Sequence, residues 1–146
     1  MKHIPLTLVT LFITYTITLT ASTPLTWDDL ITYTVTENKQ QENTILIYNK
    51  KDISIGGFIV PLDFSDDFYS VKEFLLVPDP LACIHVPPPP PNQMIHVIMN
   101  KKIPLDMDLR GVEITGTFYI NNQQTEYGDV YYKMDGKKAE ALELTF

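Results

Sequence analysis

The sequence is poor in cysteine, the residue that forms disulfides and binds soft metal ions. The 146 residues contain one cysteine, Cys83. A single cysteine cannot form a disulfide within the chain, which excludes the small secreted folds that depend on such bonds. In an oxidising compartment Cys83 must therefore be buried, bound to a metal, reactive, or joined to another molecule. The length suffices for one domain and for a core that needs no disulfide.

Basic residues are also scarce, with 11 Lys and Arg against 18 Asp and Glu. The first 22 residues hold one of the basic residues and none of the acidic ones, so the remainder has 10 against 18, a net charge of −8. Nucleic-acid binding depends largely on Lys and Arg that neutralise phosphates, and binding to anionic lipids depends on clustered basic residues. The charge therefore argues against both kinds of partner.

The opening segment, MKHIPLTLVTLFITYTITLTAS, has a lone lysine, an apolar threonine-rich run and small residues at its end. This is the layout of a secretory signal peptide. We expect cleavage near Ala21 or Ser22, which leaves one domain, residues 23–146, in the periplasm and without stable membrane insertion. The alternative is an N-terminal membrane anchor, although Pro5 and the threonines weaken the run as a spanning helix. No cysteine lies near the cleavage zone, which argues against a lipid-modified N-terminus.

No long helical periodicity follows this segment. Thr26 is a candidate N-cap for a short helical turn at TWDDL, with Asp28 and Asp29 in its first turn. The rest of the chain consists of short runs that are typical of β-strands, separated by turn residues. These runs are NTILIY, ISIGGFIVPLDF, EFLLVP, ACIHV, MIHVIM, VEITGTFYI, VYYKM and ALELTF.

Two of these runs, ISIGGF and VEITGTF, carry a glycine inside the alternating pattern. A glycine within a strand usually marks a bulge or a bend where a sheet curls. Two such strands in a small domain predict an all-β fold, in the form of a small OB-like antiparallel barrel. A small β-sandwich is the alternative. Tyr127, Tyr131 and Tyr132 are expected to fill the barrel and cover its edge.

The segment CIHVPPPPPNQ contains five consecutive prolines, residues 87–91. Proline fixes φ and donates no hydrogen bond, so the segment is expected to adopt polyproline II and to stay out of a central strand. It would be a rigid strut that joins two strands and positions the neighbouring side chains. The alternative is a ligand for an aromatic groove on a partner. Asn92 and Gln93 are expected to bond the carbonyls that the prolines leave open.

The side chains of Cys83 and His85 lie on the same side of an extended run, because side chains alternate with a period of two. A thiolate and an imidazole at this spacing can both reach one metal ion. His96 is a candidate third ligand on the returning strand, and Met94, on the same face, is a soft fourth ligand suited to copper(I). The motif has no C-x₂-C pair. The alternative is a buried thiol beside a histidine that is hydrogen-bonded to the backbone.

Two other sites receive less support from the sequence. A thiol-dependent enzyme would need His96 as its base, but no local protease signature surrounds Cys83, so we expect a protein that is not an enzyme. The aspartates of DFSDDF lack the glycine and the distal glutamate of a calcium loop, and we expect a solvated turn.

The order of TWDDL, ISIGGFIVPLDF, EFLLVP, ACIHVPPPPPNQMIHV and VEITGTF resembles an exported bacterial family of unknown function, numbered 3299. The resemblance implies a periplasmic protein of undefined biochemistry, and some members of the family are encoded beside zinc-responsive transporter genes. It favours transition-metal binding, with zinc as the metal, or an accessory role to a metal transporter. A structural or interaction module that docks another periplasmic protein through the proline strut is the alternative. The family's core motif falls on Cys83, His85, Pro87, Pro88, Pro89, Pro90, Asn92 and Gln93.

Overall fold

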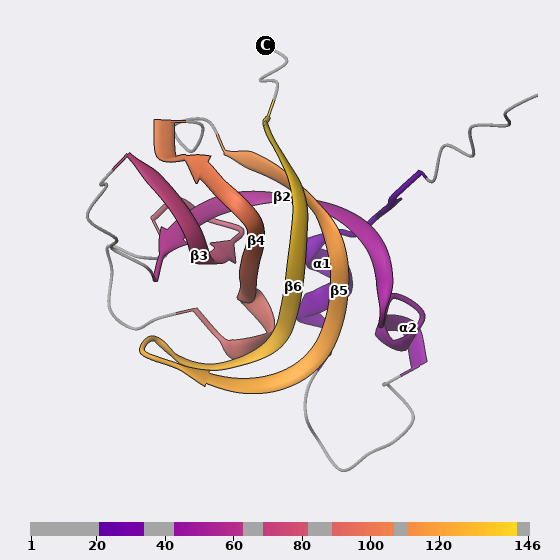
Figure 1. Cartoon of the computed structure of the whole chain (residues 1–146). Helices are drawn as coiled ribbons and strands as arrows, with labels where there is room; N and C mark the ends of the chain where they lie inside the picture. Colours follow the sequence, from indigo (N-terminus) through magenta and orange to yellow (C-terminus); the bar gives the residue numbers. More distant parts are fainter. Residues whose placement is uncertain (1–20, 34–42, 63–68, 82–88, 107–110, 143–146) are drawn as a thin grey trace, which may run out of the picture.

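The computed structural model describes residues 21–33, 43–62, 69–81, 89–106 and 111–142 (Figure 1). These residues form a mostly β domain with two short α-helices, so the prediction that β-strands dominate the fold is confirmed. The elements are β1 (Thr23–Pro24), α1 (Trp27–Ile31), α2 (Asn43–Leu46), β2 (Lys51–Pro61), β3 (Ser70–Val77), the 3₁₀ turn η1 (Pro91–Gln93), β4 (Ile95–Pro104), β5 (Val112–Thr125) and β6 (Gly128–Ala141).

The six strands form one sheet in the order β1-β2-β3-β4-β6-β5, and β2 also pairs with β5. The pairings therefore run in a closed cycle through β2, β3, β4, β6 and β5, and Figure 1 shows these strands curving around a common interior. The sheet is mixed, so the prediction of an antiparallel sheet is wrong for two pairs: β1–β2 and β4–β6 are parallel. Because the β5–β6 hairpin reverses the chain and inserts β6 between β4 and β5, β6 runs in the same direction as β4.

The interior is filled by alternate side chains of the strands. On β5, Val112, Ile114, Gly116 and Phe118 are buried while Glu113, Thr115 and Thr117 between them are half-buried, as the predicted alternation requires. Tyr132 is also fully buried, and its ring centroid lies 5.4 Å from that of Phe118. Burial raises the pKa of its hydroxyl, which donates a hydrogen bond to the carbonyl of Leu30 (3.0 Å). The predicted packing role of this tyrosine is confirmed.

The glycines predicted to mark irregular positions do so in two ways. At Gly116 the register of β5 against β6 shifts, with Lys137 as the extra residue on β6. At Gly57 the strand β2 changes partner: residues up to Gly57 pair with β5, and Phe58–Pro61 pair with β3. A Cβ atom on Gly57 would lie 2.8 Å from the carbonyl oxygen of Val77, so a side chain would obstruct this crossing.

Helix α1 begins as the sequence predicts. Thr26 is its N-cap, and Thr26 and Asp29 form a reciprocal capping box. Trp27 and Leu30 lie three residues apart and therefore on one side of the helix. Leu30 is fully buried, and the Trp27 indole donates a hydrogen bond to the carbonyl of Gly56 (2.7 Å). These two contacts hold α1 against the sheet.

One predicted strand is wrong. NTILIY forms helix α2 and the turn after it, and only Ile45 of its apolar residues is buried in the core. A short apolar run does not distinguish a buried strand from a short helix, and here the exposed Leu46 and Ile47 break the alternation. Of the predicted strand ALELTF, Ala141 is the last residue of β6.

Other predictions lie partly or wholly outside the described residues. These are the signal segment up to residue 20, DFSDDF (63–68), ACIHV (82–86) and residues 143–146. Within the described ranges, no helix is both long enough and apolar enough to cross a membrane.

Candidate functional site

A second, smaller apolar cluster lies on the outer face of β3 and β4. Ile95 and Val97 of β4 face the interior, so Met94 and His96 face outward. Met94 packs with Leu75, Val77, Val60 and Val130. Figure 1 shows the β5–β6 hairpin curving toward the side of the sheet where β3 and β4 lie, and Val130 and Tyr127 of this hairpin contribute to the cluster.

His96 lies beside this cluster and is only 8% exposed. Its ring Nε2 is 2.8 Å from Oε1 of Glu73 on β3, and its Nδ1 is 3.1 Å from Oε1 of Gln123 on β5. Glu73 and His96 are diagonal neighbours, because Leu75 is the residue directly opposite His96. Three strands that are distant in sequence thus meet at one imidazole.

The amide of Gln123 and the carboxylate of Glu73 are the two hydrogen-bond partners of the His96 ring. With the oxygen of the Gln123 amide toward the ring, Nδ1 donates to it and Nε2 faces the carboxylate of Glu73. A separation of 2.8 Å between Nε2 and the carboxylate oxygen is a hydrogen-bond distance, so a proton lies between these two atoms. The amide nitrogen of Gln123 is buried without a hydrogen-bond partner. The reversed amide would instead donate to Nδ1 and leave Nε2 as the donor to Glu73.

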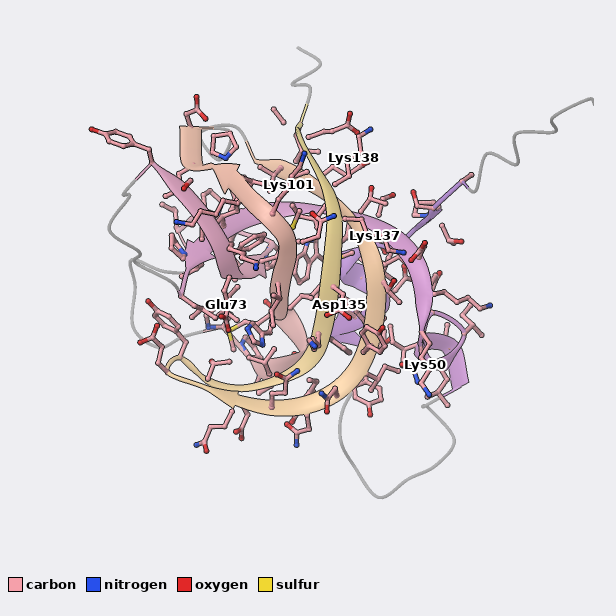
Figure 2. All side chains as sticks on the ribbon, in the orientation of Figure 1. Lys50, Glu73, Lys101, Asp135, Lys137 and Lys138 are labelled. Carbon is pink, nitrogen blue, oxygen red and sulfur yellow. The ribbon has the colours of Figure 1, made fainter. Side chains whose placement is uncertain are left out.

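A hollow of about 270 Å³ adjoins the pair. Its lining comes from the end of β2, from β3 and β4, and from the hairpin tip: Leu62, Glu73, His96, Gln124, Thr125 and Glu126. The side chain of Glu73 is 45% exposed, so one side of the pair is open to solvent. Figure 2 shows Glu73 between β3 and the tip of the β5–β6 hairpin. The arrangement places a hydrogen-bonded imidazole and carboxylate at the edge of the hollow.

Only some of the residues that the sequence predicted for this site lie within the described ranges. Cys83, His85, Pro87 and Pro88 lie outside the described residues. His96 shares the outer face of β4 with Met94, as the sequence predicts. In the part of the chain that the structure describes, no group of three or more His, Cys, Asp or Glu side chains could hold a metal ion.

Glu73 and Gln123 were missed by the sequence reasoning. Glu73 lies between Lys72 and the apolar run that begins at Phe74, Gln123 lies among polar residues, and neither is part of a local motif. Their roles depend on pairing register, which is irregular near each of them: β3 shifts against β4 between Val71 and Glu73, and β5 shifts against β6 between Ile120 and Gln123. Of the three residues that meet here, only His96 was predicted, from the alternation of side chains along its strand.

The end of the proline segment packs on helix α1. Pro90 has φ −60° and ψ 152°, which is the predicted polyproline II conformation. For Pro91 this prediction is wrong, because Pro91 is the first residue of the 3₁₀ turn η1. The Asn92 side chain donates hydrogen bonds to the carbonyls of Ile31 (2.8 Å) and Tyr33 (3.1 Å). Asn92 thus bonds the end of α1, and the prediction that it bonds proline carbonyls is wrong. Gln93 bonds a proline carbonyl through its main-chain amide, which donates to Pro90 (2.8 Å).

Comparisons with known proteins agree with this fold. A crystal structure of a DUF3299 family protein from Pseudomonas aeruginosa PAO1 is similar to the chain, with a TM-score of 0.69 and 29% identity. The similarity covers 86% of this chain and 99% of that one. No curated protein matches the chain. Residues 21–141 match the family described as "Protein of unknown function (DUF3299)", and the chain belongs to that family.

Proposed function

We propose that the protein is an exported, periplasmic metal-binding domain whose bound metal is zinc. The signal segment and the family resemblance support export. The fold is consistent with a domain that starts near the predicted cleavage position, because Thr23 already pairs with Ile53 of β2. The net charge of −8 favours the approach of cations.

We interpret the closed cycle of strands as an OB-like barrel. Numbered by their order in the chain, the five strands β2 to β6 follow the order 1-2-3-5-4-1 around the cycle. OB folds bind ligands on the face of their second and third strands, flanked by the loops that follow the first and fourth strands. The corresponding elements here are β3, β4 and the β5–β6 hairpin, which line the hollow beside His96. This is an analogy of fold, and the residues must carry the function.

The observation that carries the proposal is the orientation of His96. Metal-binding histidines usually donate their second ring N–H to an oxygen acceptor, which fixes the tautomer and the direction of the ring. With its oxygen toward the ring, the Gln123 amide accepts from Nδ1 in this way, and Nε2 would then bind a metal in place of its hydrogen bond to Glu73. Cys83 and His85 are the proposed partner ligands. They belong to the segment that connects β3 to β4. His96 is the second residue of β4.

The metal would give the domain its role, either as a zinc-binding protein or as an accessory to a metal-transport system. We propose no reaction for the domain, because Cys83 lacks the local signature of a catalytic cysteine. A partner would be such a transport system or another periplasmic protein.

Zinc and copper(I) titration of the metal-stripped, signal-free protein tests the proposal. We expect one metal ion per chain and loss of binding in the Cys83→Ala, His85→Ala double variant. At a free metal concentration of 100 times Kd, binding adds about 2.7 kcal/mol to the free energy of unfolding, so the melting temperature rises with zinc. Lys101→Ala is the control, since this exposed lysine lies on β4 outside the proposed site. Unchanged binding in the double variant contradicts the ligand assignment.

The second candidate is a structural or interaction module, and the contacts of Asn92 favour it. They use the end of the proline core to hold α1, which is an architectural role. If the protein binds neither metal and the double variant only melts at a lower temperature, this second function is the better account of the core motif.

A further inference from the structure

The end of the β5–β6 hairpin extends beyond the strands that hold the rest of it. β5 pairs with β2 only up to Phe118, and β6 pairs with β4 only from Tyr132 onward. Residues 121–130, which we call the arm, lie between these points, and within the described part of the chain they pair only with each other. We infer that the arm opens as a unit away from β3 and β4 and so controls access to His96.

The backbone is irregular at the base of the arm. Ile120 pairs with Tyr132 and Gln123 pairs with Val130, so β5 has one more residue than β6 between these two pairs. Such an extra residue interrupts the hydrogen bonds of the ladder and bends the strand. In Figure 1 the hairpin curves at this end toward the side of the sheet where β3 and β4 lie. The base of the arm is therefore where we expect a hinge.

The apolar contacts of the arm lie outside the main core. The main cluster of buried residues, as far as the structure describes it, contains Phe118 and Tyr132 on either side of the arm but no residue within it. The arm contributes the fully buried Val130 and the half-buried Tyr127 to the smaller cluster on β3 and β4. Segments with few buried apolar contacts open locally at a lower free energy than the whole domain. The arm has this property.

The hydrogen bond between the arm and His96 is accompanied by an unpaired atom. The amide of Gln123 lies 3.1 Å from Nδ1 of His96, and its nitrogen is buried without a partner. Reversing the amide exchanges its nitrogen and oxygen, so one of the two atoms is buried and unpaired in either orientation. A buried polar atom without a partner destabilises the closed arm, and water would satisfy this atom when the arm opens.

The hollow of about 270 Å³ already separates the tip of the arm from the strands. Three residues of the tip line it from one side and three from the strands line it from the other: Gln124, Thr125 and Glu126 against Leu62, Glu73 and His96. With the arm in place, His96 is 8% exposed. Opening would uncover the Nδ1 side of the ring, because Gln123 moves with the arm. The arm would thus limit access to the imidazole whether or not the ring binds a metal.

Amide hydrogen exchange, measured residue by residue by NMR, tests the inference on the signal-free protein and two matched variants. Val130→Ala removes the fully buried side chain of the arm, and Val112→Ala makes the same change in β5 within the main cluster. Conditions are chosen so that the exchange rates report the opening equilibrium. In the unaltered protein, the amides of the arm should exchange faster than those of β2 and β3.

We expect Val130→Ala to speed exchange of the arm at least about tenfold. Val112→Ala should leave the rates of the arm within about twofold of the unaltered protein, because the contacts of Val112 persist when only the arm opens. It should nevertheless speed exchange in β2 and β3, where exchange requires the whole domain to unfold. Equal effects of the two variants on the arm would overturn the inference, since the arm would then open only with the domain.

Two further measurements complete the test. In the unaltered protein, low urea should speed exchange of the arm much less than exchange of β2 and β3, because opening the arm exposes little surface. Equal urea dependence would overturn the inference without the use of any variant. Modification of His96 by diethyl pyrocarbonate, located by peptide mass spectrometry, measures access to the ring. It should be at least about tenfold faster in Val130→Ala and unchanged in Val112→Ala; equal rates in the two variants would show that the arm does not control access to His96.

Discussion

Replacing Gly116 with alanine is expected to lower the free energy of unfolding by about 3 kcal/mol. Gly116 lies in β5 where the register against β6 shifts. A Cβ atom there would overlap the carbonyl oxygen of Asp135 and lie 2.9 Å from the Cα of Gly136. Both obstacles are backbone atoms, which cannot rotate away as a side chain can. Relief therefore requires β5 and β6 to separate. Urea denaturation of the variant and the parent protein measures the change.

Gly56→Ala is the control for this experiment. It makes the same chemical change in a strand of the same sheet, but its nearest neighbour is the Leu142 side chain, with methyl carbons at 3.3 and 3.4 Å. A flexible leucine at the edge can shift, so we expect a change of less than about 1 kcal/mol. Gly-to-Ala replacement also reduces the freedom of the unfolded chain by the same amount in both variants. Equal losses of stability at the two positions would contradict the account of Gly116.

The strands that were predicted correctly are those in which the alternation of side chains can be recognised within the strand itself. In VEITGTFYI and ISIGGFIVPLDF, β-branched and aromatic residues alternate across the strand, and one face of each strand meets the core. The glycines within strands correctly predicted irregular positions, because a residue without a side chain allows two backbones to approach closely where strands cross. NTILIY was misassigned because its composition suits a strand, while only one of its apolar residues finds a place in the core.

The candidate site was predictable only in part for the same reason. The alternation along β4 placed His96 on the face of Met94, which is correct. The partners of His96 come from β3 and β5, and they reach it only because of the register of the sheet and the curvature of the hairpin. Neither property can be deduced from the residues beside Glu73 or Gln123. Asn92 is a similar case, since its hydrogen-bond partners lie about 60 residues earlier in the chain.

The anchoring of α1 leads to the second large effect. The helix has five residues, too few to be stable alone, and its last carbonyls have no partners within it. Tyr132 bonds the carbonyl of Leu30, and Asn92 bonds those of Ile31 and Tyr33. We expect Asn92→Ala to cost about 1–2 kcal/mol, because it removes the side-chain donor to the carbonyls of Ile31 and Tyr33. Tyr132→Phe should cost about 1 kcal/mol, because it removes one hydrogen bond while the Leu30 carbonyl still accepts from the backbone N–H of Tyr33 (3.1 Å). The double variant should lose less than the sum, since either change alone loosens the same helix end.

A double-mutant cycle in urea measures this coupling. Gln93→Ala is the control, because Gln93 is the neighbouring amide and its side chain makes no hydrogen bond to any other described residue; we expect a change within about 0.5 kcal/mol. Losses that add to within about 0.5 kcal/mol would mean that the two contacts are independent anchors. If Asn92→Ala does not lower the free energy of unfolding, Asn92 has no architectural role. A coupled loss, with metal binding retained in Asn92→Ala, would divide the core motif into two parts: Asn92 holds the fold together, and the residues before the prolines remain available to bind metal.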